Sequence, residues 1–572
     1  MIQKYSILGL EYGGHDTSAA LMIGGKLVAA CEQERFDLVK HSRAFPHDAI
    51  RECLKIGGIS WNDLNEISMG SDYIDMIRKV YLQPALENTE RIAFLINDIE
   101  RIKIFFEMET VIRKETGFEG PINSFRHHKC HLASTYYPSG FENALLVSYD
   151  GMGEIETGMI GRGIDGEIEI LYDKVCYPHS LGLLYSAITY FLGWTHHSDE
   201  GIIMGLAPFG NYDSKIPNDG RTYLEVFEDI VRMTGPLNYE INLDWIAYHQ
   251  KRDTWISEGF KAVFGQKREH DEPLLDHHKN IAAALQKRLE DVVLSQLAWC
   301  RNEYGLRHLC ISGGVGLNCS LNGKIAASGL FDEIFVQPAS GDAGISTGAV
   351  LLAEADRVGN IFKPKKNHNS YLGYRATKDE IQSAVNDSGQ AYDTPDNVLA
   401  LTAELLAEGL IIGWFHGEAE FGPRALGNRS ILCRPYPEEQ RDHINTRVKF
   451  REEFRPFAPA VLAEYAKEYF QINQESPHML IACQVQPEKK ERIPAVVHID
   501  NSCRVQTVKE SNNTLFYRLI KEFHKITNCP VLLNTSFNVK GQPIVNSPKQ
   551  AIDCFLSTNI DVLVVGDFIL RK

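Results

Sequence analysis

Two histidines four residues apart, His127 and His131, have the spacing in this chain that most clearly suggests chemistry. On a helix, positions i and i+4 lie on one face, so both imidazoles can reach a single cation. Asp150, in the turn of VSYDGMGE, would add a hard oxygen ligand and leave a coordination position for substrate. The alternative is that the histidines line a surface helix and Asp150 is an ordinary turn residue. The spacing alone does not decide between these two interpretations.

Glycine-rich turns at two places predict a close approach of the backbone to a ligand. The strand-like run HLCIS leads into Gly313, Gly314 and the polar Asn318, a pattern that suits a loop whose N–H groups face a phosphate or a base. Asp342 lies in a second loop, SGDAG, just before a helix rich in small residues. Asp342 is therefore a candidate for the fourth corner of the site.

The elements that must position these residues show an internal duplication. Three short strands joined by glycine turns are predicted at the start of the chain, and three more follow with an acidic residue after the first of them: 5–12, 17–24 and 26–36, then 144–151, 156–163 and 166–173. A helical periodicity over 278–302 leads into the glycine-rich loop. Two duplicated meanders and a nucleotide loop predict an α/β, actin-like architecture.

A change in composition at 359–380, where Pro364 and several lysines and asparagines interrupt the periodic segments, predicts a domain boundary near residue 365. The chain would then consist of the domains 1–365 and 366–572. The second part has helical patterns and strand-like runs typical of another α/β domain: helices at 397–408 and 513–525, strands at 410–417, 458–462, 530–537 and 562–570.

Composition excludes several classes of protein. A chain of 572 residues needs more than one core, and its 44% hydrophobic content without a long apolar run argues against a membrane protein. A net charge of −16 disfavours nonspecific binding to nucleic acid or anionic membrane. The twelve cysteines form no C-x-x-C pair, so neither a disulfide framework nor a zinc ribbon is expected. The first residues lack the pattern of a signal peptide, and we expect a cytoplasmic protein.

A series of motifs runs through nearly the whole chain in a fixed order. In the first part these are GHDTSAAL (14–21), EQERFDLVKHS (32–42), HHKCH (127–131), SYDGMGE (148–154), MGLAPFG (204–210), SGGVGLNC (312–319) and SGDAG (340–344). The second part holds longer ones, namely EFGPRALGNRSIL (420–432), NTRVKFREEFRPFAPAV (445–461), HIDNSCRVQTV (498–508) and PVLLNTSFNVKGQPIV (530–545). The set resembles the O-carbamoyltransferases that include nodulation protein U and the cephem and aminoglycoside O-carbamoyltransferases.

This resemblance implies a fold and a reaction. The first part would be similar to the actin-like tRNA threonylcarbamoyl transferases, and the second to YrdC-like proteins. The second domain would make carbamoyladenylate from carbamoyl phosphate and ATP, with Mg²⁺ as a possible companion of the nucleotide. The first domain would transfer the carbamoyl group to a hydroxyl of a small-molecule acceptor, such as a natural product in antibiotic or toxin biosynthesis. No nucleic-acid or membrane partner is implied, and the oligomeric state is not predicted.

The resemblance also assigns roles in the first domain. His127, His131, Asp150 and Asp342 would hold one divalent metal, most often iron in the family, although two N and two O donors also suit Zn²⁺ or Mn²⁺. Asp150 and Asp342 would lie beside the nucleotide phosphates, and Gly313, Gly314 and Asn318 would bind the nucleotide. His15, in the turn between the first two strands, would take the proton of the acceptor hydroxyl. A solvent-facing or capping role is the alternative for such a turn histidine.

In the second domain the resemblance assigns an anion site to Arg424, Lys449, Arg455 and Arg504, whose charges suit carbamoyl phosphate and the α-phosphate of ATP. Ser536 and Asn538 would contact the carbamoyl or adenylate group. Surface salt bridging and strand capping are the structural alternatives.

The chain departs from the family pattern at two places. Glu200-Gly201-Ile202-Ile203 stands where relatives carry a lysine before MGLAP, and Asp500-Asn501-Ser502-Cys503 replaces a more usual Asp-Gly-Thr-Ala. Two other functions remain open: carbamoylation or threonylcarbamoylation of a macromolecule, and an actin-like nucleotide switch without transferase activity.

Overall fold

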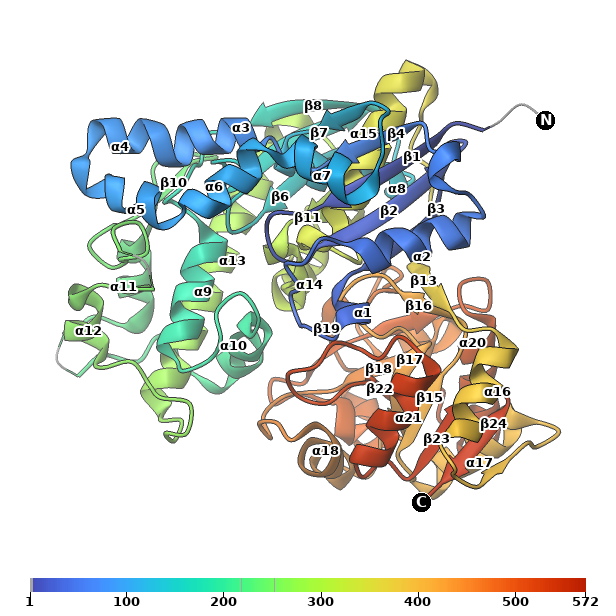
Figure 1. Cartoon of the computed structure of the whole chain (residues 1–572). Helices are drawn as coiled ribbons and strands as arrows, with labels where there is room; N and C mark the ends of the chain where they lie inside the picture. Colours follow the sequence, from blue (N-terminus) through green and yellow to red (C-terminus); the bar gives the residue numbers. More distant parts are fainter. Residues whose placement is uncertain (1–3, 218, 252) are drawn as a thin grey trace. The chain divides into compact units, whose positions relative to one another are not determined.

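The computed structural model describes residues 4–217, 219–251 and 253–572, which divide into two compact units (Figure 1). The first unit comprises the chain up to Leu27 together with Ile59–Asn367. The second comprises Val28–Gly58 and His368–Lys572. The later division lies close to the boundary predicted at residue 365, whereas the sequence did not indicate that the segment 28–58 belongs with the second unit.

The first sheet has the strand order β3-β2-β1-β4-β5. Its strands are β1 (Ser6–Glu11), β2 (Ser18–Ile23), β3 (Lys26–Glu32), β4 (Glu66–Met69) and β5 (Ile122–Ser124). β2 runs antiparallel to β1, whereas β4 is parallel to β1 and β5 is parallel to β4. The predicted meander is therefore present, but its third strand ends at Glu32 because the chain turns into the short helix α1 (Glu34–Asp37).

The second sheet repeats this topology. Its strands are β6 (Asn143–Tyr149), β7 (Gly158–Ile164), β8 (Glu167–Tyr172), β11 (His308–Ser312) and β12 (Glu333–Val336). The order β8-β7-β6-β11-β12 again places an antiparallel meander beside two parallel strands. The predicted duplication is confirmed, and it is the feature that an actin-like architecture requires.

Two helices that pack against each other connect the sheets. α8 (His127–Ser139) contacts β6 and β11, while α15 (Ile345–Val358) contacts β1 and β2. Gly348 of α15 allows this close packing, because a Cβ there would lie only 2.0 Å from the carbonyl oxygen of Cys130. Since α8 carries both site histidines and α15 follows Asp342, this helix pair sets the distance between the candidate ligands.

The remaining helices of the first unit lie mostly beside this core, toward the left and top of Figure 1. The long helix α13 (Asp276–Tyr304) is the one predicted over 278–302, and it contacts α9 (Leu181–Phe191), α10 (Glu200–Leu206) and α11 (Tyr223–Ile230). The others are α3 (Tyr73–Met76), α4 (Gln83–Glu87), α5 (Ile92–Asn97), α6 (Ile99–Phe106), α7 (Met108–Thr116), α12 (Glu258–Phe264) and α14 (Cys319–Ala327), with a small hairpin of β9 (Val231–Met233) and β10 (Tyr239–Ile241).

The second unit is built on a mixed sheet of order β14-β24-β23-β15-β17-β22-β18-β21. Its strands are β14 (Tyr392–Asp393), β15 (Ile412–Phe415), β17 (Arg429–Cys433), β18 (Ala458–Leu462), β21 (Gln506–Val508), β22 (Val531–Ser536), β23 (Val562–Val565) and β24 (Phe568–Arg571). Two small sheets pair β13 (Tyr371–Arg375) with β16 (Glu418–Glu420) and β19 (Ala482–Gln484) with β20 (Ser502–Arg504). The helices are α2 (His47–Gly57), α16 (Lys378–Asp387), α17 (Val398–Glu408), α18 (Glu439–Ile444), α19 (Ala466–Tyr469), α20 (Thr514–Thr527) and α21 (Pro548–Ser557).

Most predicted elements of this unit are present, and one is different. α17 and α20 lie where helices were predicted, and β15, β18 and β22 lie within predicted strands. The run 562–570 is a hairpin of β23 and β24 rather than one strand. Gly566 adopts a φ of +59° in the turn, a conformation that glycine permits without strain. Both units are therefore mixed α/β.

Two expectations from composition can be compared with the structure. The cysteines are free thiols, and all but Cys176 and Cys483 are buried. Within the described residues, every helix is too short or too polar to cross a bilayer.

Candidate functional site

Four candidate metal ligands converge at one end of the first unit's helix pair. His127 and His131 lie in the first turns of α8, Asp150 follows β6, and Asp342 begins the single turn of 3₁₀ helix before α15. One ligand atom from each residue falls within 4.8 Å of the others. His131 Nε2 lies 2.8 Å from Asp150 Oδ2 and 3.7 Å from Asp342 Oδ1, and His127 Nε2 lies 3.7 and 3.6 Å from the same two oxygens. The structure thus brings the four predicted ligands together.

The motif SYDGMGE also holds α8 in place. Glu154, at its end, is buried and uses Oε1 to accept the backbone N–H groups of His127 and Asp72, each at 2.8 Å. His128 is fixed separately, since its Nε2 donates to the carbonyl of Glu156 at 2.8 Å and its Nδ1 contacts Ser148 Oγ at 2.9 Å. Burial, followed by the neighbouring histidines, lowers the pKa of His128 to about 3. His128 is therefore a neutral structural residue, as its fixed ring indicates.

The chemistry of this cluster fits a divalent cation. The side chains of His127 and His131 are 6% and 0% exposed, and His127 Nε2 has no hydrogen-bond partner among the described residues. A buried, unpaired imidazole nitrogen aimed at two carboxylates is costly unless a ligand satisfies it. Burial would raise the pKa of Asp150, but the neighbouring imidazoles of His127 and His131 hold it well below its usual value. The carboxylate is thus ionised and available, and two N with two O donors suit Fe²⁺, Zn²⁺ or Mn²⁺.

His15 lies beside this cluster, in the turn after β1. Its Nδ1 is 2.9 Å from Asp16 Oδ2 and 3.8 Å from Asp342 Oδ2, and its side chain is 34% exposed. Ser18 fixes the turn, because its Oγ donates to the Ala343 carbonyl at 2.7 Å. Burial lowers the pKa of His15, but the hydrogen bond to Asp16 and the charge of Asp342 raise it to about 10. A cation shared by the aspartates would offset that charge and lower the pKa of His15 again.

The predicted nucleotide loop lies against the same edge. Gly313 has a φ of +84°, and a Cβ there would lie 2.2 Å from the Tyr149 carbonyl oxygen. A Cβ on Gly314 would lie 2.9 Å from Asp150 Oδ1. Asn318 has a different environment: its side chain caps α14 by accepting the Leu321 N–H at 2.9 Å and exchanges two hydrogen bonds with Gln286. Asn318 holds the strand-to-helix turn, and its contact with nucleotide stays a prediction.

In the second unit three further predicted residues meet. Lys449 ends a turn of π-helix, Asn445–Lys449, and is 4% exposed. Its ammonium donates to Asn538 Oδ1 at 2.8 Å and to the carbonyl of Asn538 at 3.0 Å, and it also bonds to the carbonyl of Ser536. Ser536 Oγ donates to Asn538 Oδ1 at 2.7 Å. Turns of π-helix are frequent at functional sites, and here the turn brings Lys449 onto the end of β22.

An arginine that the sequence analysis did not select, Arg451, lies in the same electrostatic environment. Burial, then the charges of Arg455 and Arg504, hold the pKa of Arg451 well below its usual value. Burial, then Arg451, also lowers the pKa of Lys449 well below its usual value. A nearby carboxylate, Glu452, lies 3.7 Å from Arg455. So many cations around one carboxylate favour a multiply charged anion. Its place inside NTRVKFREEFRP was the available sequence signal for Arg451.

Arg424 lies on a separate loop, residues 421–428, which we name the Arg424 loop and whose backbone bonds to β21 and β22. Gln506 Nε2 donates to the Leu426 carbonyl at 2.8 Å, and Asn534 Nδ2 donates to the Ala425 carbonyl at 3.3 Å. Along the chain, Gln506 lies two residues after Arg504, and Asn534 lies two residues before Ser536. The second arginine of this motif, Arg429, is fully buried, and it donates to the backbone carbonyls of His416, Gly417, Asn428 and Tyr374.

Comparison with known proteins decides the family. The model of the carbamoyltransferase N-terminus matches residues 6–351, and that of the carbamoyltransferase C-terminus matches residues 403–572. The chain belongs to the carbamoyltransferase family. It is 35% identical to an uncharacterized protein of Synechocystis over 99% of this chain and 96% of that protein. Nodulation protein NolNO of Sinorhizobium fredii is 35% identical over 98% of this chain and 79% of its own length.

A relative with a named activity is also similar to this carbamoyltransferase. The 3'-hydroxymethylcephem-O-carbamoyltransferase of Streptomyces clavuligerus is 36% identical over 46% of this chain and 49% of its own length. The predicted family and the prediction of a transferase enzyme are confirmed.

The family departures of this carbamoyltransferase are accommodated locally. Asn501 adopts a φ of +65°, a conformation in which asparagine is the best substitute for glycine. Asp500 Oδ1 accepts the Ser502 N–H at 3.0 Å and its hydroxyl at 2.6 Å, so the turn before Arg504 is retained. Ile202 and Ile203 are buried in α10, which makes them packing residues.

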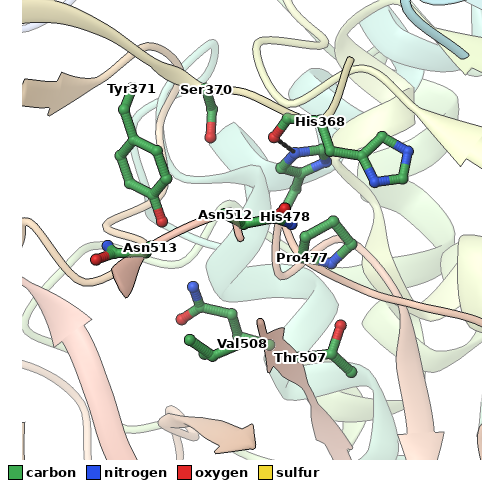
Figure 2. A pocket seen from close by; sticks show the side chains of 10 residues that line it. His368, Ser370, Tyr371, Pro477, His478, Thr507, Val508, Asn512 and Asn513 are labelled. Atoms are coloured by element: carbon green, nitrogen blue, oxygen red, sulfur yellow. Dashed lines mark hydrogen bonds between the residues drawn. The ribbon is translucent and has the colours of Figure 1, made fainter. Parts of the chain in front are cut away.

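A small pocket of the second unit is lined by Tyr371, His478 and Asn513 among others (Figure 2). Two of its lining residues, Tyr371 and Gln506, bond to the Leu426 carbonyl of the Arg424 loop. Its cavity of about 10 Å³ has room for about one water, not for a nucleotide. His478 Nε2 donates to the His368 carbonyl at 3.0 Å, and burial lowers the pKa of His478 to about 4. Tyr371 Oη donates to the Leu426 carbonyl at 3.0 Å. The pocket thus supports the loop rather than binding substrate.

Proposed function

We propose that this protein is an ATP-dependent O-carbamoyltransferase that works through carbamoyladenylate. Carbamoyl phosphate and water would give carbamate and phosphate, and the carbamate oxygen would then attack the α-phosphate of ATP and release pyrophosphate. The acceptor hydroxyl would attack the carbamoyl carbon, giving the carbamate ester, AMP and a proton. The observation that carries this proposal is the coexistence, in a chain of this family, of a four-ligand cluster beside His15 and a separate cluster of cations.

The second unit would carry out the adenylate-forming step, in a domain that we propose to be YrdC-like. Arg451, Arg455 and Arg504 give the region a positive potential that suits the phosphates of carbamoyl phosphate and ATP. Lys449 already holds Ser536 and Asn538 through its ammonium. These contacts would preorganise hydroxyl and amide groups toward the carbamoyl moiety. Arg424 would contact the phosphate of carbamoyl phosphate.

The first unit would carry out the transfer. A divalent cation held by His127, His131, Asp150 and Asp342 would supply Lewis-acid stabilisation of negative charge on the adenylate. His15 would accept the proton of the acceptor hydroxyl at its Nε2, because Asp16 orients the ring through Nδ1. The backbone N–H groups of Gly313 and Gly314 would bind a nucleotide phosphate, since no side chain blocks the approach.

The acceptor would be a small molecule with a hydroxyl group. The name of the Streptomyces clavuligerus relative states an O-carbamoyl transfer to a hydroxymethylcephem, and the acidity of the chain disfavours nucleic acid. Surface loops of the first unit would determine which hydroxyl is accepted.

The proposal is tested by incubating the purified protein with carbamoyl phosphate and α-³²P-labelled ATP. We expect pyrophosphate release that depends on carbamoyl phosphate, together with a labelled acyl-adenylate. Lys449→Ala is expected to abolish both, whereas Lys525→Ala, which removes an exposed lysine paired with Glu522, is expected to leave them unchanged. Absence of pyrophosphate with the wild-type protein would refute the mechanism.

A further inference from the structure

The Arg424 loop is anchored by buried side chains at nearly every residue that flanks Arg424. Glu420, itself 3% exposed, uses Oε1 to accept the N–H groups of Leu426 at 2.7 Å and Asn428 at 2.9 Å. Beyond Arg424, carbonyls of the loop accept hydrogen bonds from four side chains, those of Asn534, Gln506, Tyr371 and Trp414. The backbone that carries Arg424 is therefore fixed on its C-terminal side.

On the N-terminal side of Arg424 the anchor comes from a remote part of the chain. Arg35, in α1 of the segment 28–58, donates through Nη2 to the Gly422 carbonyl at 2.6 Å. Its Nε donates to Glu32 Oε2 at 2.7 Å, and the residue is 4% exposed. A buried guanidinium held by a carboxylate on one edge and a loop carbonyl on the other is a rigid connection.

The electrostatics of this contact favour a permanent cation at position 35. Burial lowers the pKa of Arg35, but the charges of Glu32, Glu34 and Glu420 raise it above its usual value. Glu420 therefore acts on the loop in two ways: it accepts the N–H groups that follow Arg424, and it attracts the guanidinium that binds the carbonyl before it. Lysine could satisfy Glu32 or Gly422, but its single ammonium lacks the planar fork that spans both.

We infer that Arg35 is a positioning residue for Arg424, and that the N-terminal segment 28–58 is thereby part of the adenylate-forming site. This inference rests on the proposed function. Arg35 touches no reacting group; it fixes the Gly422 carbonyl, two residues before Arg424, so that the Arg424 guanidinium stays oriented toward the anion. Loss of this contact would loosen phosphate binding without removing the cations themselves.

The test is a double-mutant cycle in the full-length protein, with carbamoyl-phosphate-dependent pyrophosphate release as the readout. Arg35→Lys is expected to raise the KM for carbamoyl phosphate by about tenfold, as the loss of a charged hydrogen bond does, and to change kcat much less. Arg424→Ala is expected to raise the KM further. In the double variant the Arg35→Lys substitution is expected to add nothing, because the side chain that Arg35 positions is already gone.

Arg51 provides the matched control, since it lies in the same segment but is 75% exposed and pairs only with Asp48 among the described residues. Arg51→Lys is expected to behave as wild type. Additive effects of Arg35→Lys and Arg424→Ala, or an unchanged KM in Arg35→Lys, would overturn the inference while leaving the proposed function intact. A wild-type protein without pyrophosphate release would instead refute the proposed function. A binding measurement makes the same comparison: inorganic phosphate is added, and the rise in melting temperature is compared between the wild-type protein and Arg35→Lys. A smaller or absent rise in Arg35→Lys would support the inference, and an equal rise would overturn it.

Discussion

At the scale of single residues, the two clusters differ in how their charges are balanced. The first unit combines two histidines and two aspartates within 4.8 Å, so one divalent cation would complete a balanced set of ligands. The second unit gathers Lys449, Arg451, Arg455 and Arg504 close enough to repel one another, so an anion would balance their charge. The cluster in the first unit thus suits a cation, and the cluster in the second unit suits an anion.

The ligand role of His127 predicts a loss of metal. His127→Ala removes a buried nitrogen donor, and metal affinity is expected to fall by at least about 100-fold, since even the outer partners of a ligand contribute 10–100-fold. Metal content of the dialysed protein measures this, with His443→Ala at an exposed position as the control. Full stoichiometric metal in His127→Ala would exclude the residue from the site.

His15 is expected to act only in the transfer step. His15→Asn preserves polarity and approximate size but removes the basic nitrogen, so carbamoyl transfer to a hydroxyl acceptor is expected to fall by about 10²–10⁴-fold. Pyrophosphate release in the other unit is expected to persist and serves as the internal control. Equal losses in both assays would show that the substitution acts on the fold or on nucleotide binding instead.

At the scale of secondary-structure elements, the site depends on how closely α8 and α15 pack. Their ends present His127, His131 and Asp342, and Gly348 allows the helices to approach. The alternation of residues and the glycine turns were sufficient to predict both meanders, whereas the i, i+4 spacing of His127 and His131 only showed what a helix there would do. The hairpin of β23 and β24 was missed although Gly566-Asp567 interrupts the apolar run, because this two-residue turn signal was not used to divide the predicted strand.

Substitution of Gly348 tests this packing. In Gly348→Ala the new Cβ would lie 2.0 Å from the Cys130 carbonyl oxygen, and we expect a loss of about 1–3 kcal/mol in unfolding free energy, together with weaker metal binding. Gly201→Ala in α10 is the matched control, because no atom lies within 4 Å of its added Cβ. It is expected to stabilise the protein by about 0.5–1 kcal/mol. Urea unfolding of the two variants distinguishes them, and equal stabilities would show that the helices can separate without cost.

At the scale of the whole molecule, the net charge of the chain does not show where charged side chains gather in the fold. The net charge of −16 gives no sign of the cation cluster; the family motifs predicted Lys449, Arg455 and Arg504 as part of it, and the fold adds Arg451. In the same way, nothing in the sequence indicated the grouping of 28–58 with the second unit. Contacts of that segment, such as the hydrogen bond from Arg35 to Gly422, join residues far apart in sequence, and local propensity does not encode them.

The concentration of cations predicts that anions stabilise the second unit. Inorganic phosphate or pyrophosphate is expected to raise the melting temperature by binding the folded state, because either anion relieves repulsion among Arg451, Arg455 and Arg504. Arg504→Ala is expected to reduce this shift, whereas Arg518→Ala, an exposed arginine paired with Glu510, is expected to keep it. An equal shift in all three proteins would indicate a general salt effect.

Acid sensitivity of the second unit follows from a buried neutral histidine, His416. Burial, then the charge of Arg429, lowers the pKa of His416 to about 3, and its ring lies on that of Trp414. Unfolded histidine titrates near pH 6.5, so between these values the unfolded chain binds a proton that the folded chain excludes, and stability falls as the pH falls. His416→Phe keeps the ring stacking and removes this proton, so the slope of unfolding free energy with pH is expected to flatten by about 1.4 kcal/mol per pH unit. Urea titrations read by pulse proteolysis at several pH values measure the slope of unfolding free energy with pH. The control is His443→Phe, at an exposed position. An unchanged slope in His416→Phe would mean that the folded protein also protonates the ring of His416.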